Sequence, residues 1–440
     1  MRARLFALLF AAAVAGQAHG ETLIEATASA LDTSPALAAE RARLEAVREE
    51  LPIAWAEALP QVTLDASAFD NNSSEASFGL SVREQDEYWI GSIRTSTLLF
   101  GGGRAWFSRR QARAQIAEAV ARYQDSAQNL VLDVARAYGD VRQEQAIVAA
   151  QEQAVANYAE QRRYVNAHLR HGFLTQTDQA QADARYAASR ADLALANARL
   201  VAANEAFLRL VGRPASALAA PQPLTDIPAS LDEALAIAEE NNPRILARTA
   251  NYAASDAAVD VAAAQGRARV TFDTTDSSFA ARSGPAQNEE ESESNVTLRL
   301  SVPLFSGGEI RARTRQQRHL RDASRSDLEE ERRRVHEGVS VAWSNLAAAR
   351  SREESSGVRV EAAELASRGV LREQEFGQRS TIDVLDQENE LLQARIALAQ
   401  AERQSMVAER ELAAELGLLI AFTQRSEPAL QLPPRRDRRG

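Results

Sequence analysis

The sequence contains neither cysteine nor lysine among its 440 residues. Without cysteine the chain has no disulfide and no thiolate ligand, and without lysine it cannot form a Walker-type phosphate loop. Aromatic residues make up only 5% of the chain, and no stretch after the N-terminus offers 18 consecutive apolar residues. The composition therefore excludes a helical membrane span in that part and favours long helices over a compact core.

The N-terminus has the pattern of a secretory signal peptide. Two arginines precede an apolar run from Leu5 to Val14, and small residues follow. This pattern predicts a signal peptide over residues 1–20, cleaved after Ala18 or Gly20, with a short buried helix as the alternative. The formal net charge is −10, and loss of the two arginines makes it −12. That balance disfavours nucleic acid as a partner.

An internal duplication runs through the rest of the sequence. The segment STLLFGGG (Ser96–Gly103) has a counterpart 205 residues later in SVPLFSGG (Ser301–Gly308). Upstream the offset is 208 residues, and it relates VTLD at Val62 to VTFD at Val270. A repeat of this length indicates one supersecondary unit used twice. The predicted divisions are a first repeat over 21–212, a linker over 213–230, a second repeat over 231–420 and a disordered tail over 421–440.

Each repeat is expected to hold two β-strands after an initial helical segment, which covers residues 23–58 or 231–265. In NVTLRLSVPLF (Asn295–Phe305) apolar and polar residues alternate with period two, which indicates a strand with one apolar face. QVTLDASAF (Gln61–Phe69) and WIGSIRTSTLLF (Trp89–Phe100) are also predicted as strands. Polar loops are expected between the strands, and the acidic loop over 282–295 is expected outside the cell.

The expected strand length fits the thickness of a membrane. Strands of about twelve residues tilted near 45° rise about 26 Å, close to the apolar band of an outer-membrane barrel. Four strands cannot close a barrel, because the smallest single-chain barrels have eight, and an open edge is not tolerated in lipid. Several copies of the chain must therefore contribute strands to one barrel, and three copies would give twelve strands.

Two long helices are expected after the strands of each repeat. The strands end at two pairs of glycines, Gly102, Gly103, Gly307 and Gly308. A helical pattern of about 65 residues follows, which spans roughly 100 Å if unbroken, up to a turn at Gly172 or Gly377. The final helix begins at TQTD or STID, which resemble a capping box with aspartate in place of glutamate, and ends at Gly212 or Gly417.

The chain resembles the TolC family of outer-membrane efflux proteins over about residues 22–420. The resemblance rests on the duplicated helix–strand–strand–helix order, on LFGGG and VPLFSGG, on ENNPRI (Glu240–Ile245), and on FGQRSTIDVLDQENELLQARIALAQAE (Phe376–Glu402). It implies an α+β membrane protein with four transmembrane β-strands per chain. Three chains would complete a 12-stranded barrel in the outer membrane, continued by a long α-helical coiled-coil barrel in the periplasm.

The same resemblance implies a function and partners. The chain would be a passive exit duct, not an enzyme and without a cofactor, embedded in outer-membrane lipid as a homotrimer. A periplasmic adaptor (membrane fusion) protein and an inner-membrane ABC or RND-type pump would open it at its periplasmic tip. Type I protein secretion and multidrug efflux both stay open, and FGQRSTIDVLDQENEL favours the type I secretion branch.

The resemblance also implies a gate at the periplasmic tip. Its acidic ring corresponds to Asp383 and Asp386, with Arg379 as a tethering partner and with Thr177 and Asp178 as partner positions in the first repeat. Gln374 replaces a tyrosine of the family, so the closed state is expected to be weaker. Helix capping is the alternative role of Asp383, because a carboxylate in the first turn of a helix is favoured by the helix dipole.

No catalytic, cofactor-binding or metal-binding constellation is expected from the sequence. His168 and His171 share a helix face, and a solvated pair is favoured there over a metal site. The alternative function is a periplasmic adaptor-like coiled-coil interaction protein. Such a protein would not need two pairs of membrane-length strands.

Overall fold

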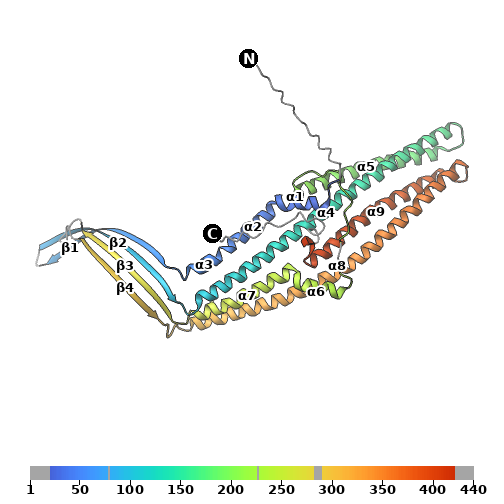
Figure 1. Cartoon of the computed structure of the whole chain (residues 1–440). Coiled ribbons are helices and arrows are strands. Elements are labelled where there is room, and N and C mark those ends of the chain that lie inside the picture. Colours follow the sequence, from blue (N-terminus) through green and yellow to red (C-terminus); the bar gives the residue numbers. More distant parts are fainter. Residues whose placement is uncertain (1–19, 78–79, 225–226, 282–289, 422–440) are drawn as a thin grey trace, which may run out of the picture. The chain divides into compact units, whose positions relative to one another are not determined.

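The computed structural model describes residues 20–77, 80–224, 227–281 and 290–421 (Figure 1). The predicted signal peptide up to residue 19, residues 282–289 of the acidic loop and the tail from residue 422 lie outside the described residues. The chain divides into two compact units. Unit 1 holds residues up to 38, 125–242 and those from 335, and unit 2 holds 39–124 and 243–334. Each unit therefore combines segments of both sequence repeats.

The described residues form nine helices and four strands. The helices are α1 (Leu23–Thr33), α2 (Pro35–Arg48), α3 (Glu50–Ala56), α4 (Arg104–Arg170), α5 (Gln176–Val211), α6 (Leu231–Asn241), α7 (Pro243–Ala264), α8 (Glu309–Glu375) and α9 (Thr381–Glu415). The strands are β1 (Gln61–Ser77), β2 (Leu80–Phe100), β3 (Arg269–Ala281) and β4 (Glu290–Ser301). Among the described helices, none combines the length and the apolar character that a membrane crossing requires.

The initial helical segment of each repeat is broken, where one helix was predicted. Both repeats break at equivalent residues, Ser34 and Asn242, whose ψ angles of 117° and 119° are extended, and the first repeat has a further break at Glu49. Ser34 and Asn242 each precede a proline, which disfavours helical backbone in the residue before it. Pro35 and Pro243 then begin α2 and α7, at the position where a missing N–H costs nothing.

The four strands form one antiparallel sheet in the order β1–β2–β3–β4 (Figure 1). The predicted polar loop between the first two strands is largely strand, because β1 continues to Ser77 and β2 begins at Leu80. Residues 290–295, predicted as part of a loop, lie in β4. The prediction was wrong here because it took polar residues as a sign of a loop. In an antiparallel hairpin the backbone N–H and C=O groups pair between strands whether or not one face of the hairpin is apolar.

The core of unit 1 forms where α1, α4 and α5 pack together. Tyr138 of α4 is fully buried against Phe207 of α5 and Ala26 of α1. Its hydroxyl lies 2.8 Å from the carbonyl oxygen of Glu21 and 2.6 Å from that of Ala219. Burial raises the pKa of Tyr138 to about 12. This tyrosine therefore fixes both Glu21, just before α1, and the linker between repeats to the long helix.

Candidate functional site

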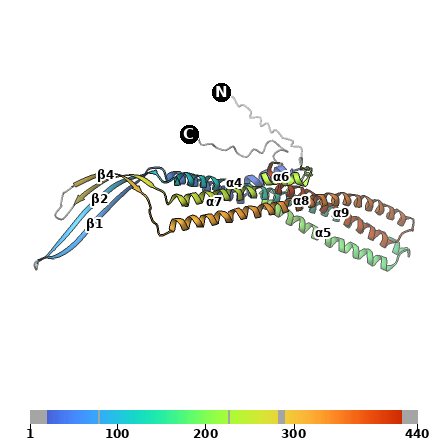
Figure 2. The same cartoon turned by 90° about the horizontal axis from the view of Figure 1, so that it is seen from below.

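The helix turns predicted as the tip lie together at one end of unit 1 in both views (Figures 1 and 2). Gly172 joins α4 to α5 with φ +75°, and Gly377 joins α8 to α9 with φ +71°. The N–H of the residue after each glycine donates to a carbonyl five residues earlier, at 3.0 Å and 2.8 Å. This geometry closes a helix C-terminus and requires a left-handed residue, which glycine adopts without strain.

A capping box opens the helix after each turn. The carboxylate of Asp178 accepts from the N–H and hydroxyl of Thr175 at 2.8 and 2.7 Å. Asp383 accepts from the same groups of Ser380 at 3.0 and 2.7 Å. The pKa of each carboxyl is lowered, and the largest cause is the hydrogen bond from the hydroxyl of Thr175 or Ser380. Asp383 thus caps α9 at the position where the acidic ring is predicted.

Of the remaining predicted gate residues, Asp386 and Arg379 each form an ion pair and the uncharged Thr177 does not. Asp386 of α9 pairs with Arg185 of α5, with 2.9 Å between Oδ1 and Nη2. Arg379 pairs with Glu373 across its own turn at 2.7 Å. Thr177 is exposed. The structure therefore joins Asp386 to the first repeat through an arginine that the sequence analysis did not select.

A buried carboxylate that sequence analysis missed connects three helices near the same end. Glu388 of α9 is only 5% exposed. It accepts from Asn157 of α4 at 2.5 Å and from Ser367 of α8 at 2.6 Å. The sequence indicates the burial of Glu388, because this residue lies three positions after Leu385 and four before Leu392, on the apolar face of α9.

Two buried polar side chains flank the α8–α9 turn. Gln374 is 7% exposed and its amide nitrogen has no hydrogen-bond partner in the described part of the chain. The hydroxyl of Thr381, at the start of α9, is also buried without a partner there. Ser367 of α8 bonds Glu388 of α9, so an antiparallel pair in that register places Gln374 at the level of Thr381. Both side chains therefore lie at one level between α8 and α9, beside the turn.

The glycines at the strand ends have the predicted role of redirecting the backbone. Gly102, Gly103, Gly307 and Gly308 all have φ between +62° and +86°. A Cβ added to Gly102 would lie 2.5 Å from the Cβ of Arg267, so this position also needs the space. At Gly307 and Gly308 no atom lies within 4 Å of such a Cβ, and only the backbone angle calls for glycine.

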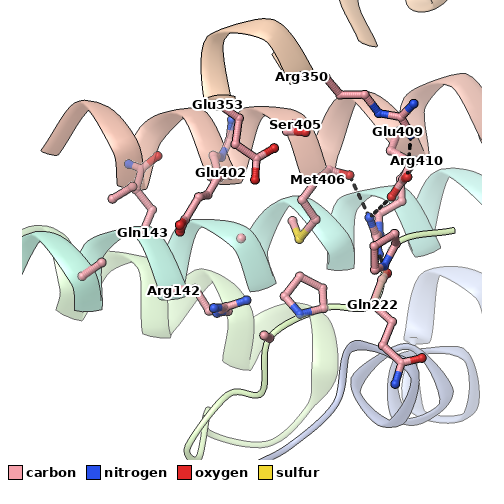
Figure 3. A pocket seen from close by; sticks show the side chains of 17 residues that line it. Arg142, Gln143, Gln222, Arg350, Glu353, Glu402, Ser405, Met406, Glu409 and Arg410 are labelled. Atoms are coloured by element: carbon pink, nitrogen blue, oxygen red, sulfur yellow. Dashed lines mark hydrogen bonds and ion pairs between the residues drawn. The ribbon is translucent and has the colours of Figure 1, made fainter. Parts of the chain in front are cut away.

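A pocket of about 530 Å³ lies in unit 1 between α4, α8, α9 and residues 220–223 (Figure 3). The buried Arg410 lines this pocket and donates to the carbonyls of Met406 and Gln222 at 3.0 and 2.9 Å. Burial lowers the pKa of Arg410, while Glu409 beside it opposes that effect. Glu409 also pairs with Arg350 at 3.2 Å. These charges are satisfied within the chain, so they hold the linker against α9.

In the described part of the chain, no three His, Asp or Glu side chains lie close enough together to serve as metal ligands. His168 packs on Tyr164 with ring centroids 4.0 Å apart. Its Nδ1 lies 2.9 Å from the Tyr164 carbonyl oxygen. These contacts hold the ring of His168 against its own helix.

Comparison with known families and sequences finds outer membrane efflux proteins and related outer-membrane proteins. The family model for outer membrane efflux protein matches residues 27–213 and 234–418. The outer membrane efflux protein BepC of Brucella suis is 29% identical over 426 residues, which cover 94% of this chain and 91% of BepC. The outer membrane protein TolC of Vibrio cholerae is 26% identical over 91% of both chains. The alkaline protease secretion protein AprF of Pseudomonas aeruginosa is 28% identical over 71% of this chain and 66% of its own.

Solved structures share the fold at lower sequence identity. The structure of CusC aligns with a TM-score of 0.78 at 18% identity, over 90% of this chain and 92% of CusC. The outer-membrane channel OprN aligns with a TM-score of 0.76 at 24% identity, over 90% of this chain and 89% of OprN. The predicted fold class is therefore confirmed.

Proposed function

Because this chain belongs to the outer membrane efflux protein family, it is an export channel of the outer membrane, and we propose that it is the exit duct of a tripartite export system. The duct is passive and takes its substrate from an inner-membrane ABC or RND-type pump through a periplasmic adaptor. The two matched segments of the family model, 27–213 and 234–418, support a duct built from both repeats.

We propose that the working form is a homotrimer. Strands β1 and β4 are the two edges of the sheet, and in lipid an edge must find a partner. Identical copies joined edge to edge in a closed ring satisfy every edge. Three copies give a barrel of twelve strands, within the size range of outer-membrane barrels.

The observation that supports a gate at the tip is the ion pair between Arg185 and Asp386. It joins the α4–α5 hairpin to the α8–α9 hairpin close to both turns. The duct opens when the adaptor and pump separate these hairpins, and the ion pair favours the closed state. Asp383 adds a second carboxylate one turn from Asp386, so three copies place six carboxylates around the aperture and attract cations.

The adaptor binds at the turns themselves. Phe173 and Phe376 are 77% and 79% exposed, and they lie beside Gly172 and Gly377 respectively. Exposed aromatic side chains at the end of a hairpin are typical anchors of a protein interface. Replacing both phenylalanines with serine should abolish adaptor capture while leaving the trimer intact.

The client is proposed to be a protein of a type I secretion system, a small toxic compound, or both. AprF is a secretion protein by name and BepC is an efflux protein by name, and both align with this chain. The two client classes can be separated in a deletion strain, complemented either with the wild-type chain or with the Phe173→Ser/Phe376→Ser variant. Loss of secreted proteins identifies the first client class, and greater drug susceptibility identifies the second. An unaffected deletion strain would contradict the proposal.

A further inference from the structure

Two edge strands of the sheet carry side chains with no partner of their own. Asp65 on β1 and Ser301 on β4 are both exposed, and neither side chain has a hydrogen bond or ion pair within the described part of the chain. β1 and β4 are separated in the sheet by β2 and β3. A single chain therefore cannot bring these two side chains together.

The contact between β2 and β3 shows what such side chains do when they meet. This is where the first sequence repeat joins the second, and Ser96 of β2 stands directly opposite Asp273 of β3. The Ser96 hydroxyl donates to Oδ1 of Asp273 at 2.6 Å. Thr271 donates to Oδ2 of the same carboxylate at 3.0 Å. A carboxylate in the wall of the sheet thus has a donor on each oxygen.

The duplication copies both partners of this hydrogen bond onto the edge strands. The offset of 205 residues carries Ser96 to Ser301, and the offset of 208 residues carries Asp273 to Asp65. It also carries Thr271 to Thr63, so the second donor is repeated. The chain therefore contains one complete hydrogen bond at its centre and the two separate halves of another at its edges.

We propose that β4 of one copy pairs antiparallel with β1 of the next copy, in the register that sets Ser301 opposite Asp65, with the Ser301 hydroxyl donating to the Asp65 carboxylate. The occupant of each edge is thus a second copy of this chain. The inference rests on the proposed trimer and adds the register of its joints. Around a closed ring, bonds within a chain and bonds between chains then alternate.

The helices beside the strands do not carry the same duplicated contact. Arg110 of α4 pairs with Asp256 and Asp260 of α7 at 3.2 and 3.5 Å. The counterparts of these residues are Arg315, Arg48 and Pro52, which cannot form an equivalent ion pair. The serine–aspartate pair is, in contrast, a polar contact that both joints can share.

Disulfide trapping tests the register directly, because the chain contains no cysteine. The full-length chain carrying Asp65→Cys and Ser301→Cys is expressed in a Gram-negative host, and isolated outer membranes are oxidised. Directly opposite residues in neighbouring strands have Cβ atoms about 4.5–5.5 Å apart, close to the roughly 3.5–4.5 Å of a disulfide. A denaturing gel should show two and three covalently joined chains, which reduction returns to one.

The matched control moves one cysteine by two residues on the same face, as Asp65→Cys with Arg299→Cys. That shift adds roughly 7 Å along the strand, so this pair should stay uncrosslinked. Cross-linking of the control in place of the Ser301 pair would overturn the register. A trimer by light scattering with neither pair cross-linked would overturn the inference and leave the proposed duct standing. A monomer would overturn both.

Discussion

Removing Arg185 should make the closed duct easier to open. The Arg185–Asp386 pair is 2.9 Å long, with its side chains 43% and 58% exposed. A half-exposed pair of this kind contributes about 0.2–1 kcal/mol. Three symmetric copies would contribute about 0.6–3 kcal/mol, and the Arg185→Ala variant should therefore shift the equilibrium toward the open state by about 3-fold to about 150-fold.

Single-channel recording in planar bilayers measures this shift as open probability. The matched control is Arg162→Ala, because Arg162 pairs with Asp183 at similar exposure but joins α4 to α5 within one hairpin. Arg162→Ala should leave opening unchanged. The charge-exchanged variant Arg185→Asp/Asp386→Arg should recover part of the closed population. Equal open probability in Arg185→Ala and wild type would refute the proposal that the Arg185–Asp386 ion pair holds the duct closed. An equal rise in Arg162→Ala would refute it as well.

Three further predictions concern stability, measured by circular dichroism in detergent. Gly417→Ala should lower Tm more than Gly377→Ala. A Cβ at Gly417 would lie 2.3 Å from a backbone oxygen, whereas a Cβ at Gly377 would have no atom within 4 Å. Equal shifts in Tm would contradict this. Glu388→Ala should cost about 1–3 kcal/mol for each donor left without its acceptor, and Glu388→Gln, which keeps an acceptor, should cost less; the reverse order would be inconsistent with the three-helix contact. The folded-state pKa values of Asp178 and Asp383 lie below the ordinary 3.8, so their stabilisation is present above that pH and is lost as the pH falls through the lowered values. The Asp178→Asn/Asp383→Asn variant should therefore lose less stability on acidification than wild type, and parallel curves would exclude the effect.

Local patterns in the sequence were sufficient for most of the fold. The 67-residue helices α4 and α8, the turns at Gly172 and Gly377 and the two aspartate capping boxes were all predicted. Each depends on residues within a few positions of one another, through helical periodicity, positive φ or a side chain that bonds its own first turn. The lengths of β1 and β2 were underestimated, because hairpin pairing continues through polar residues that carry no alternation. The fourth strand was predicted to end at Phe305 and ends at Ser301.

The candidate site was predicted only in part. Asp386 was selected from the sequence, but its partner Arg185 lies 201 residues away and in the other repeat. Glu388 was passed over, although it interrupts an apolar stripe, because its partners Asn157 and Ser367 lie on two other helices. A sequence shows that a polar residue occupies a core position, but not which donor will face it.

The sequence by itself determined the duplication, the elements and the turns of this chain, since these follow from spacing along one backbone. Only the tertiary structure decided which elements meet. It joined α5 to α9 through Arg185 and Asp386, and it made β2 and β3 the joint between repeats through Ser96 and Asp273. Such contacts depend on the relative register of elements far apart in the chain. That register is set by the packing and hydrogen bonding of many side chains together, which no local spacing encodes.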